Sequence, residues 1–249
     1  MFLMAVSDFF SLGLLLAIWS AISRQHQIPG YTPQQIVLYM IVARVVQAGV
    51  RNRVDRDLAN LIYRGNLAQE LRLPVNHQLY TVIKVLSRNG WSFLYGATVT
   101  VVLSTLFIRG MRLVPEGSVL PALGPEMLLG LPAVSVALGL SVSSNYCIGL
   151  LAMWTRTQKG IAHLKDLLFA VLSGALIPLD LFPDWLRQIS AVMPYRWIVY
   201  EPTRILTGLS TPGEALRLLA IQCLWVLGLG LVSSLAWKRA VRKLEVHGE

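Results

Sequence analysis

The stretch MLLGLPAVSVALGLSVSSNYCIGLLAMW, residues 127–154, decides the fold class of this chain. It runs for 28 residues without a charged side chain. A helix needs about 20 mostly apolar residues to cross the hydrocarbon core of a bilayer. The whole chain has the same character, with 14% charged residues, against about 25% in a typical soluble domain, and a mean hydropathy of +0.57. The sequence therefore predicts an integral membrane protein.

Outward from this stretch, five further apolar segments are long enough, or nearly so, to cross a membrane. The six predicted spans are about 1–22, 36–50, 79–108, 127–154, 161–181 and 215–237. We therefore expect one all-α transmembrane domain over residues 1–249. An even number of spans places both termini on the same side of the membrane.

The cations are distributed unevenly between the two sets of loops. The loops after the second and fourth spans, with their span ends and the C-terminal tail, hold twelve: Arg51, Arg53, Arg56, Arg64, Arg72, Arg156, Lys159, Lys165, Lys238, Arg239, Arg242 and Lys243. The opposite set holds six: Arg24, Arg109, Arg112, Arg187, Arg196 and Arg204. The positive-inside rule then predicts a cytoplasmic 51–78 loop and cytoplasmic termini, with 109–126 and 182–212 outside. The net charge of +9 mainly reflects this topology, and we expect no nucleic-acid partner.

Sequence motifs for catalysis are absent. The chain has no G-x-x-x-x-G-K-[ST] phosphate loop, no H-E-x-x-H and no G-x-S-x-G. Four histidines fall in four separate places: His26, His77, His163 and His247. Cys147 and Cys223 lie inside apolar runs and form no C-x-x-C motif. We therefore predict no catalytic residue, no bound cofactor and no metal site in this chain.

The loop over residues 51–76 is charged but contains apolar residues at helical spacing. Leu58, Leu61 and Ile62 share one helix face, and Leu67 and Leu71 share another after the break at Arg64-Gly65-Asn66. Pro74 ends the second helix. Such an apolar face lies on the bilayer or docks a partner. The alternative is a solvated basic connector.

A second polar segment follows the fifth span. Pro178 and Pro183 end or kink that span, and Trp185, Ile189 and Val192 form the apolar face of a short helix. An aromatic belt at the outer membrane interface is formed by Trp185, Tyr195, Trp197 and Tyr200. The segment is an interfacial hairpin that anchors the span, or a lid over a translocation route.

The fourth predicted span carries two rows of small residues at spacings of four. One row is Ser135, Gly139 and Ser143, and the other is Ser141, Asn145 and Gly149. Such rows permit close packing of helices in lipid, where association depends on contact and interhelical hydrogen bonds. We interpret them as packing residues, with a substrate-lining role for Asn145 as the alternative.

Two of these segments resemble a known family. The stretch IYRGNLAQELRLPVN (62–76) resembles the G-x-L-x-x-x-L-x-x-P-x-N segment of type-2 ATP-binding-cassette (ABC) exporter permeases. The stretches SGALIPLDLFPDWL (173–186) and MPYRWIVYEP (193–202), followed by Gly208, are similar to that family's segment before its last span. The resemblance extends over nearly the whole chain, including the six-span plan.

The resemblance implies a permease that pairs with a second permease copy or paralogue and with two ATPase subunits. ATP and Mg²⁺ would then be bound by the partner ATPase. It implies ATPase coupling for Leu58, Leu61, Arg64, Gly65, Leu67, Leu71 and Pro74. It implies an external gate hairpin for Gly174, Pro178, Asp180, Pro183, Trp185, Pro194, Tyr195 and Pro202.

The resemblance also implies an amphipathic cytoplasmic helix before the first span, and this sequence has none. Either the chain is a variant of the family or its start is assigned too far downstream, and we expect the native protein to begin upstream of Met1. The expected function is substrate export across the cytoplasmic or inner membrane by alternating access driven by ATP hydrolysis, with the substrate itself unspecified. The alternatives are an ATP-independent secondary carrier or an assembly factor, and an intramembrane enzyme is disfavoured by the missing motifs.

Overall fold

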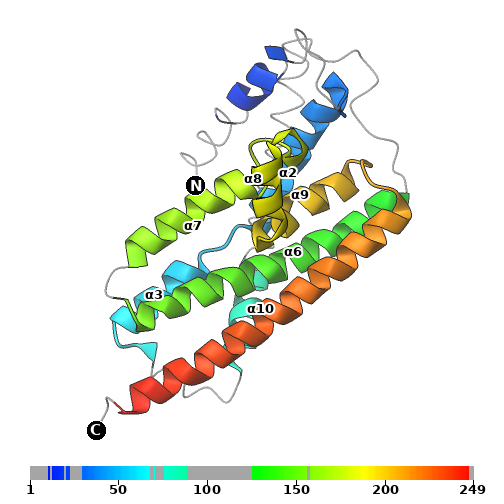
Figure 1. Cartoon of the computed structure of the whole chain (residues 1–249). Coiled ribbons are helices and arrows are strands. Elements are labelled where there is room, and N and C mark those ends of the chain that lie inside the picture. Colours follow the sequence, from blue (N-terminus) through cyan, green and yellow to red (C-terminus); the bar gives the residue numbers. More distant parts are fainter. Residues whose placement is uncertain are drawn as a thin grey trace.

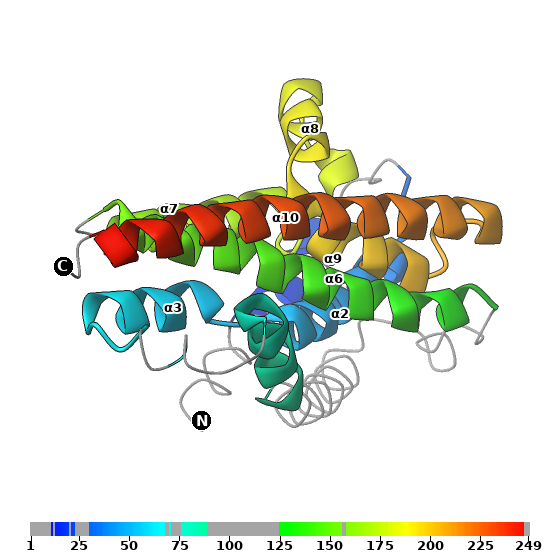
Figure 2. The same ribbon diagram turned by 90° about the horizontal axis from the view of Figure 1, so that it is seen from below.

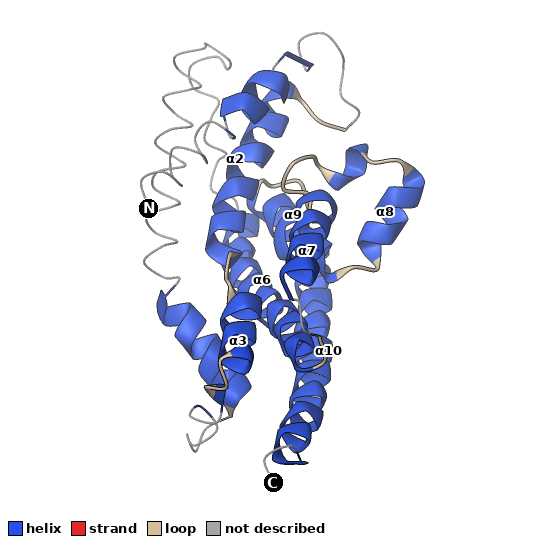
Figure 3. Cartoon of the chain, turned by 90° about the vertical axis from the view of Figure 1, so that its left-hand side faces the viewer, coloured by secondary structure: helices blue, strands red, loops and turns tan. Residues whose placement is uncertain are grey.

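The computed structural model of the chain describes residues 11, 13–19, 21, 22, 30–67, 70, 76–88, 125–155 and 158–246. Within these ranges the structure is all-helical, with no strand (Figures 1 and 3). A helix over 77–88 lies between α3 and α6 in the sequence. The labelled elements are α2 (Pro33–Val50), α3 (Val54–Tyr63), α6 (Pro125–Leu150), η1 (Leu151–Met153), α7 (Gln158–Leu172), η2 (Leu179–Leu181), α8 (Asp184–Ala191), α9 (Pro194–Leu206) and α10 (Pro212–Val246).

The central element of the fold is α6, which is apolar on all sides and packs against α2, α3, α9 and α10. A helix that is apolar all round is expected in the interior of a bundle. Together α6 and η1 account for the predicted span 127–154. The long helix α10 lies along α6 for most of its length (Figures 1 and 2).

The apolar core has two parts, one at each end of α6. The first part joins α2, α9 and the first halves of α6 and α10, around Tyr39, Leu140 and Ile198. The second part, called here the inner core, joins α3, the helix over 77–88 and the second halves of α6 and α10. Its buried residues are Val54, Leu58, Leu67, Val85, Val142, Tyr146, Leu150 and Ala240.

Two helices of the described chain are long and apolar enough to cross a membrane, over Leu128–Met153 and Pro212–Val241. The two helices differ in their surroundings. Of the most apolar 18 residues of each, 61% are buried in the helix over Leu128–Met153 and 17% in the helix over Pro212–Val241. The exposed face of α10 is lined by leucines, among them Leu224, Leu227 and Leu231. This face is suited to contact with lipid.

The predicted fifth span, 161–181, is not one helix. Helix α7 ends at Leu172, and the chain turns at Gly174, whose φ is +76°. The turn is held by the Tyr39 hydroxyl of α2, which donates to the Gly174 carbonyl oxygen at 2.8 Å. A glycine adopts this left-handed conformation without the steric penalty of a Cβ atom. The helix therefore ends well before the apolar sequence does.

Helix α9 was not predicted, and it lies in the first part of the core. Nine of its residues are buried, including Glu201, which is 0% exposed. Arg196 and Arg204 pair with the Glu201 carboxylate at 2.7 and 3.4 Å. By contrast, α8 stands out sideways from the bundle (Figure 2), with Trp185 and Val192 exposed.

Parts of several predictions lie outside the described residues. These parts are most of the spans 1–22 and 79–108, the 109–124 segment, and the coupling residues Leu71 and Pro74. The helix over 77–88 includes the start of the predicted span 79–108. For the predicted second and sixth spans the structure has α2 and α10, which begin and end at somewhat different residues.

Candidate functional site

Helix α3 is a short helix with acidic residues in its first turn and a capped C-terminus. Asp55 and Asp57 lie in its first turn, where a carboxylate interacts favourably with the helix dipole. At its C-terminus the Asn66 amide donates to the Leu61 carbonyl at 3.0 Å, and the Gly65 amide donates to the Ile62 carbonyl at 3.1 Å. These two bonds with a left-handed glycine form a Schellman motif, and Gly65 has a φ of +71°. The break predicted at Arg64-Gly65-Asn66 is thus the C-terminal cap of α3.

The apolar face of α3 is turned into the chain itself. Leu58 is 2% exposed and Leu67 is 3% exposed, and both belong to the inner core with Val85 and Tyr146. Leu61 is half-buried. The interpretation of this face as a surface that lies on the bilayer or docks a partner is therefore wrong for Leu58 and Leu67. Their burial partner is the rest of this protein.

Helix α3 comes close to the backbone of α6 at Gly149. A Cβ atom on Gly149 would lie 3.1 Å from the Cα atom and the carbonyl oxygen of Asp55, and 3.1 Å from the Leu58 Cβ atom. Two of these neighbours are backbone atoms, which do not move aside as a side chain does. A side chain at this position would therefore push the two helices apart by a few tenths of an ångström.

A polar network joins α3 to α6 and α7 on one side. The Lys165 ammonium donates to Asp55 Oδ2 at 2.9 Å and to Asn145 Oδ1 at 3.2 Å. Asn145 Nδ2 donates to Asn52 Oδ1 at 2.8 Å, and Asn52 Nδ2 donates to Ser141 Oγ at 2.9 Å. Asp55 is 1% and Lys165 9% exposed, so both charges are removed from water. A buried ion pair needs such additional hydrogen bonds to offset its desolvation.

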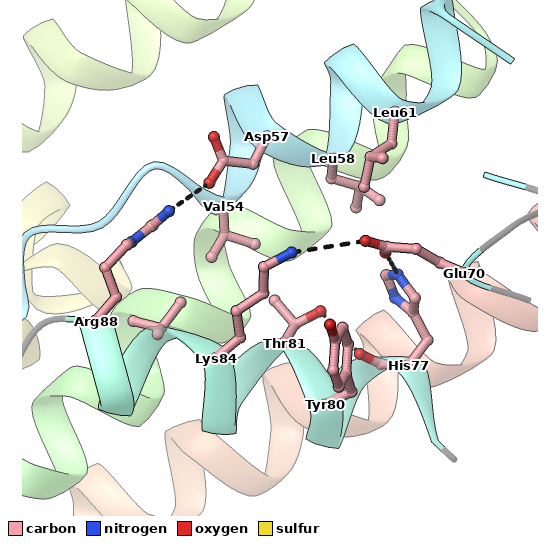
Figure 4. A pocket seen from close by; sticks show the side chains of 11 residues that line it. Val54, Asp57, Leu58, Leu61, Glu70, His77, Tyr80, Thr81, Lys84 and Arg88 are labelled. Atoms are coloured by element: carbon pink, nitrogen blue, oxygen red, sulfur yellow. Dashed lines mark hydrogen bonds and ion pairs between the residues drawn. The ribbon is translucent and has the colours of Figure 1, made fainter. Parts of the chain in front are cut away.

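The other side of α3 faces the helix over 77–88 across a small pocket that is open to solvent (Figure 4). Asp57 pairs with Arg88 at 3.1 Å, and Glu70 pairs with Lys84 at 3.6 Å. Glu70 also lies 2.7 Å from His77 Nε2. Polar contacts therefore hold α3 and the segment after it from both sides, while its apolar face is packed between them.

The free end of α3 remains exposed. Tyr63, Arg64, Gly65 and Asn66 are all exposed at this end. The Tyr63 hydroxyl donates to the Thr155 carbonyl at 2.9 Å, which links the end of α3 to the segment after α6. We call the group Tyr63, Arg64, Asn66 and Trp154 the α3 tip.

The residues predicted for the external hairpin lie away from α3. Asp180 accepts a hydrogen bond from the Tyr31 hydroxyl at 2.6 Å, which joins η2 to the residue before the N-cap of α2. Burial, followed by this hydrogen bond, raises the pKa of the Tyr31 phenol, so Tyr31 remains a donor. The remaining predicted residues occupy these places: Pro178 and Pro183 at the N-caps of η2 and α8, Pro194 at the first residue of α9, and Tyr195 and Pro202 buried within α9.

The two rows of small residues on α6 face different neighbours. Ser141, Asn145 and Gly149 face the junction of α2, α3 and α7, as described above. Gly139 lies against Val226 of α10, and Ser135 is exposed. Ser143 is buried. The predicted coupling residues and the second row of small residues thus meet at the α3–α6 contact.

Sequence reasoning missed His77, Lys165 and Glu201. Lys165 and Glu201 stand in largely apolar surroundings, where an ionisable residue signals a nearby partner of opposite charge. His77 carries no comparable signal, because its neighbours in space come from distant parts of the chain. Among the described residues, no group of three or more His, Cys, Asp or Glu side chains is placed to hold a metal ion.

Comparison with known proteins identifies the family. A model of the family described as "ABC-2 family transporter protein" matches residues 9–248, nearly the whole chain. The chain belongs to the ABC-2 transporter family. No curated protein and no solved structure matches it.

Membership in the ABC-2 family explains the composition and the apolar helices. An ABC-2 chain is a membrane subunit of a transporter, and the family partners with an ABC ATPase. The resemblance carried by residues 62–76 and 173–202 is therefore confirmed at the level of the family.

Proposed function

We propose that this chain is the permease subunit of an ABC exporter that works by alternating access, driven by ATP hydrolysis in its partner. The complex contains two ATPase subunits and two permeases, which are two copies of this chain or this chain and a paralogue. It lies in the cytoplasmic or inner membrane, with both termini and α3 in the cytoplasm. The observation that carries the proposal is the fastening of α3 to α6, α7 and the helix over 77–88.

The contacts of α3 support a role in coupling. Its base is held to α6 and α7 by Asp55 and Lys165 and to the helix over 77–88 by Asp57 and Arg88. Its exposed end is joined to the segment after α6 by the hydrogen bond from the Tyr63 hydroxyl to the Thr155 carbonyl. A force applied to the α3 tip is therefore passed to the bundle instead of being lost in bending. This is what a contact with an ATPase subunit requires.

The α3 tip is the surface that we assign to the ATPase. Tyr63 is 46% and Trp154 48% exposed, and Arg64 adds a cation beside them. Aromatic residues and arginine are the residue types enriched at the centres of protein interfaces. Leu58 and Leu67 contribute indirectly, because they hold α3 in place from its buried side.

The test is co-purification of the ATPase from native membranes with the tagged full-length permease. Mass spectrometry identifies the associated ATPase, and ATP hydrolysis by the complex is measured. Tyr63→Ala and Arg64→Glu should each lower the ATPase recovered per permease at least fivefold. Trp185→Ala and Arg187→Glu are matched controls on exposed positions of α8, and they should leave recovery unchanged.

Two results would contradict the proposal. Recovery of no ATPase with the wild-type permease would favour the ATP-independent carrier or assembly factor. Full recovery of the ATPase with both tip variants would show that the α3 tip is not part of the interface, while the proposed complex would still stand.

A further inference from the structure

His77 lies where four parts of the chain meet. Its Nε2 atom is 2.7 Å from a Glu70 carboxylate oxygen, and its Nδ1 atom is 2.8 Å from the Tyr146 hydroxyl of α6. Its ring stacks on Trp237 of α10, with centroids 4.3 Å apart and an interplanar angle of 10°. The side chain of His77 is 7% exposed. One imidazole ring therefore contacts three other parts of the chain at once: helix α6, helix α10 and Glu70, which follows α3.

The proton positions on His77 follow from its partners. A carboxylate only accepts hydrogen bonds, so the His77 Nε2–H group donates to Glu70. In the neutral ring, Nδ1 then accepts from the Tyr146 hydroxyl. Both ring nitrogens and one ring face are thus used. Histidine is the one natural side chain whose ring carries two nitrogens that can each take part in a hydrogen bond.

The turn that contains His77 is fixed to α10 by a second residue. Gln78 Nε2 donates to Ser233 Oγ at 2.6 Å, and Ser234 Oγ donates to Gln78 Oε1 at 2.7 Å. Asn76 caps the same turn, since its Oδ1 accepts from the Gln78 amide at 3.0 Å. The start of this helix and the second half of α10 therefore move together.

The far side of the same helix is tied to α3. Arg88 pairs with Asp57, and Lys84 reaches Glu70, which is also the partner of His77 (Figure 4). Lys84 and Arg88 are about half exposed, so these two pairs are weak. The buried link through His77 is the stronger connection between the segment after α3 and α10. Any displacement of Glu70 acts on Trp237 through one side chain.

We propose that His77 is a positioning residue that transmits movement of α3 to α10, an inference that rests on the coupling function proposed above. Leu67 is buried with Leu58 of α3 in the inner core, so Glu70, three residues further on, is displaced when α3 moves. His77 follows Glu70, and Trp237 follows His77. Because α10 extends from Pro212 to Val246, a movement at Trp237 reaches the other end of the bundle. Without the His77 side chain, the conformation of α10 should therefore no longer depend on the nucleotide state of the ATPase, although the ATPase should still bind.

The experiment uses the intact complex, purified with its ATPase and placed in lipid nanodiscs. Cys147 and Cys223 are replaced by alanine, and a single cysteine is placed at Thr211, an exposed residue directly before α10. The labelling rate of this cysteine with a fluorescent maleimide is compared without nucleotide and after trapping with ATP and vanadate. This readout requires no knowledge of the transported substrate.

The informative variant is His77→Phe, which keeps a ring for Trp237 and removes both hydrogen bonds. The wild-type complex should show at least a threefold difference in labelling rate between the two states, and His77→Phe should reduce it below 1.5-fold. His77→Gln, which retains a donor for Glu70, should restore part of the difference. His163→Phe is the matched control at an exposed histidine of α7, and it should behave as wild type.

The outcomes separate this inference from the proposed function. If no ATPase purifies with the wild-type chain, the proposed function fails and the inference fails with it. If the complex forms but the wild type shows no difference at Thr211, or His77→Phe keeps the difference, the inference alone is overturned. If His77→Phe does not assemble, Glu70→Met is judged by the same criteria. Failure of both variants to assemble would assign His77 to folding and overturn the inference.

Discussion

At Gly149 we expect substitution by alanine to have the opposite effect on stability from the one it has at most glycines in a helix. In an exposed helix, Gly→Ala usually stabilises by about 1 kcal/mol. At Gly149 the added Cβ atom would lie 3.1 Å from backbone atoms of Asp55. We expect Gly149→Ala to destabilise the protein by about 1 to 3 kcal/mol, the range for overpacking a core. Unfolding by SDS in mixed micelles measures the change in free energy of unfolding.

Gly228→Ala on α10 is the control for Gly149→Ala. A Cβ atom at Gly228 meets nothing within 4 Å, so this variant should be as stable as wild type or slightly more stable. Equal effects of the two substitutions would show that α3 does not rest on α6 in the membrane.

The Lys165–Asp55 pair offers a second test at the scale of single residues. Lys165→Met removes the ammonium beside a carboxylate that is 1% exposed, and losing one partner of a buried pair destabilises by about 3 to 5 kcal/mol. Replacing both residues, as in Asp55→Leu with Lys165→Met, should recover most of this loss, because an apolar pair carries no buried charge. The same SDS unfolding assay completes the double-mutant cycle. Additive losses in the double variant would argue against a direct pair.

Sequence patterns located the apolar face of a helix correctly, but they did not show which surface covers that face. The spacing of Leu58 and Leu61 predicted an amphipathic helix, and α3 is one. The pattern is identical whether the covering surface is lipid, a partner or the same chain. The partners of Leu58 and Leu67 are Val85 and Tyr146, which come from other parts of the chain, and no local pattern specifies them.

At the scale of elements, the end of α3 depends on the conformation of Gly65. Its φ of +71° costs about 1 to 2 kcal/mol for a residue with a Cβ atom. Gly65→Val should therefore weaken the Schellman motif and loosen the last turn of α3. Hydrogen exchange of the α3 amides, followed by mass spectrometry, should be faster in this variant.

Asparagine at the same position separates backbone strain from side-chain contacts. Asn tolerates the left-handed region better than Val, and a Cβ atom at Gly65 meets nothing within 4 Å. Gly65→Asn should therefore exchange more slowly than Gly65→Val. Equal exchange in both variants would contradict a conformational role for Gly65.

The helix boundaries around α7 show why apolar sequence alone does not locate an element's end. Apolar residues continue beyond Leu172, so the sequence predicted one span over 161–181. The segment after Leu172 is apolar because the turn at Gly174 is buried against Tyr39 and Tyr200, not because it is helical. Helix α9 was missed for the opposite reason. Its charges, Arg196, Glu201 and Arg204, pair with one another inside the bundle.

At the scale of the whole molecule, composition and charge asymmetry were sufficient for the class of protein and for a prediction of orientation. They do not specify contacts such as Tyr31 with Asp180, which lie far apart in the chain. The orientation is tested with single cysteines at Asn66 and Thr211, in a background without Cys147 and Cys223. A membrane-impermeant maleimide applied to intact cells should label position 211 and not position 66.

Permeabilised cells provide the control for this orientation test. Both positions are exposed, so both should react once the membrane is opened. Labelling of position 66 alone in intact cells would reverse the predicted topology, and with it the assignment of the α3 tip to a cytoplasmic ATPase.

The length of α7 has a consequence for how the protein is made. Its 15 residues rise about 22 Å, less than the hydrocarbon thickness of about 30 Å. During synthesis, such a segment leaves the ribosome before α9, the helix that completes its surroundings after α3 and α6. It is too short to remain in the bilayer as an independent stop-transfer sequence. Integration of α7 should therefore wait for α9, and in a nascent chain arrested at Ala191, before α9, a single cysteine placed within residues 158–172 should remain accessible to a water-soluble maleimide.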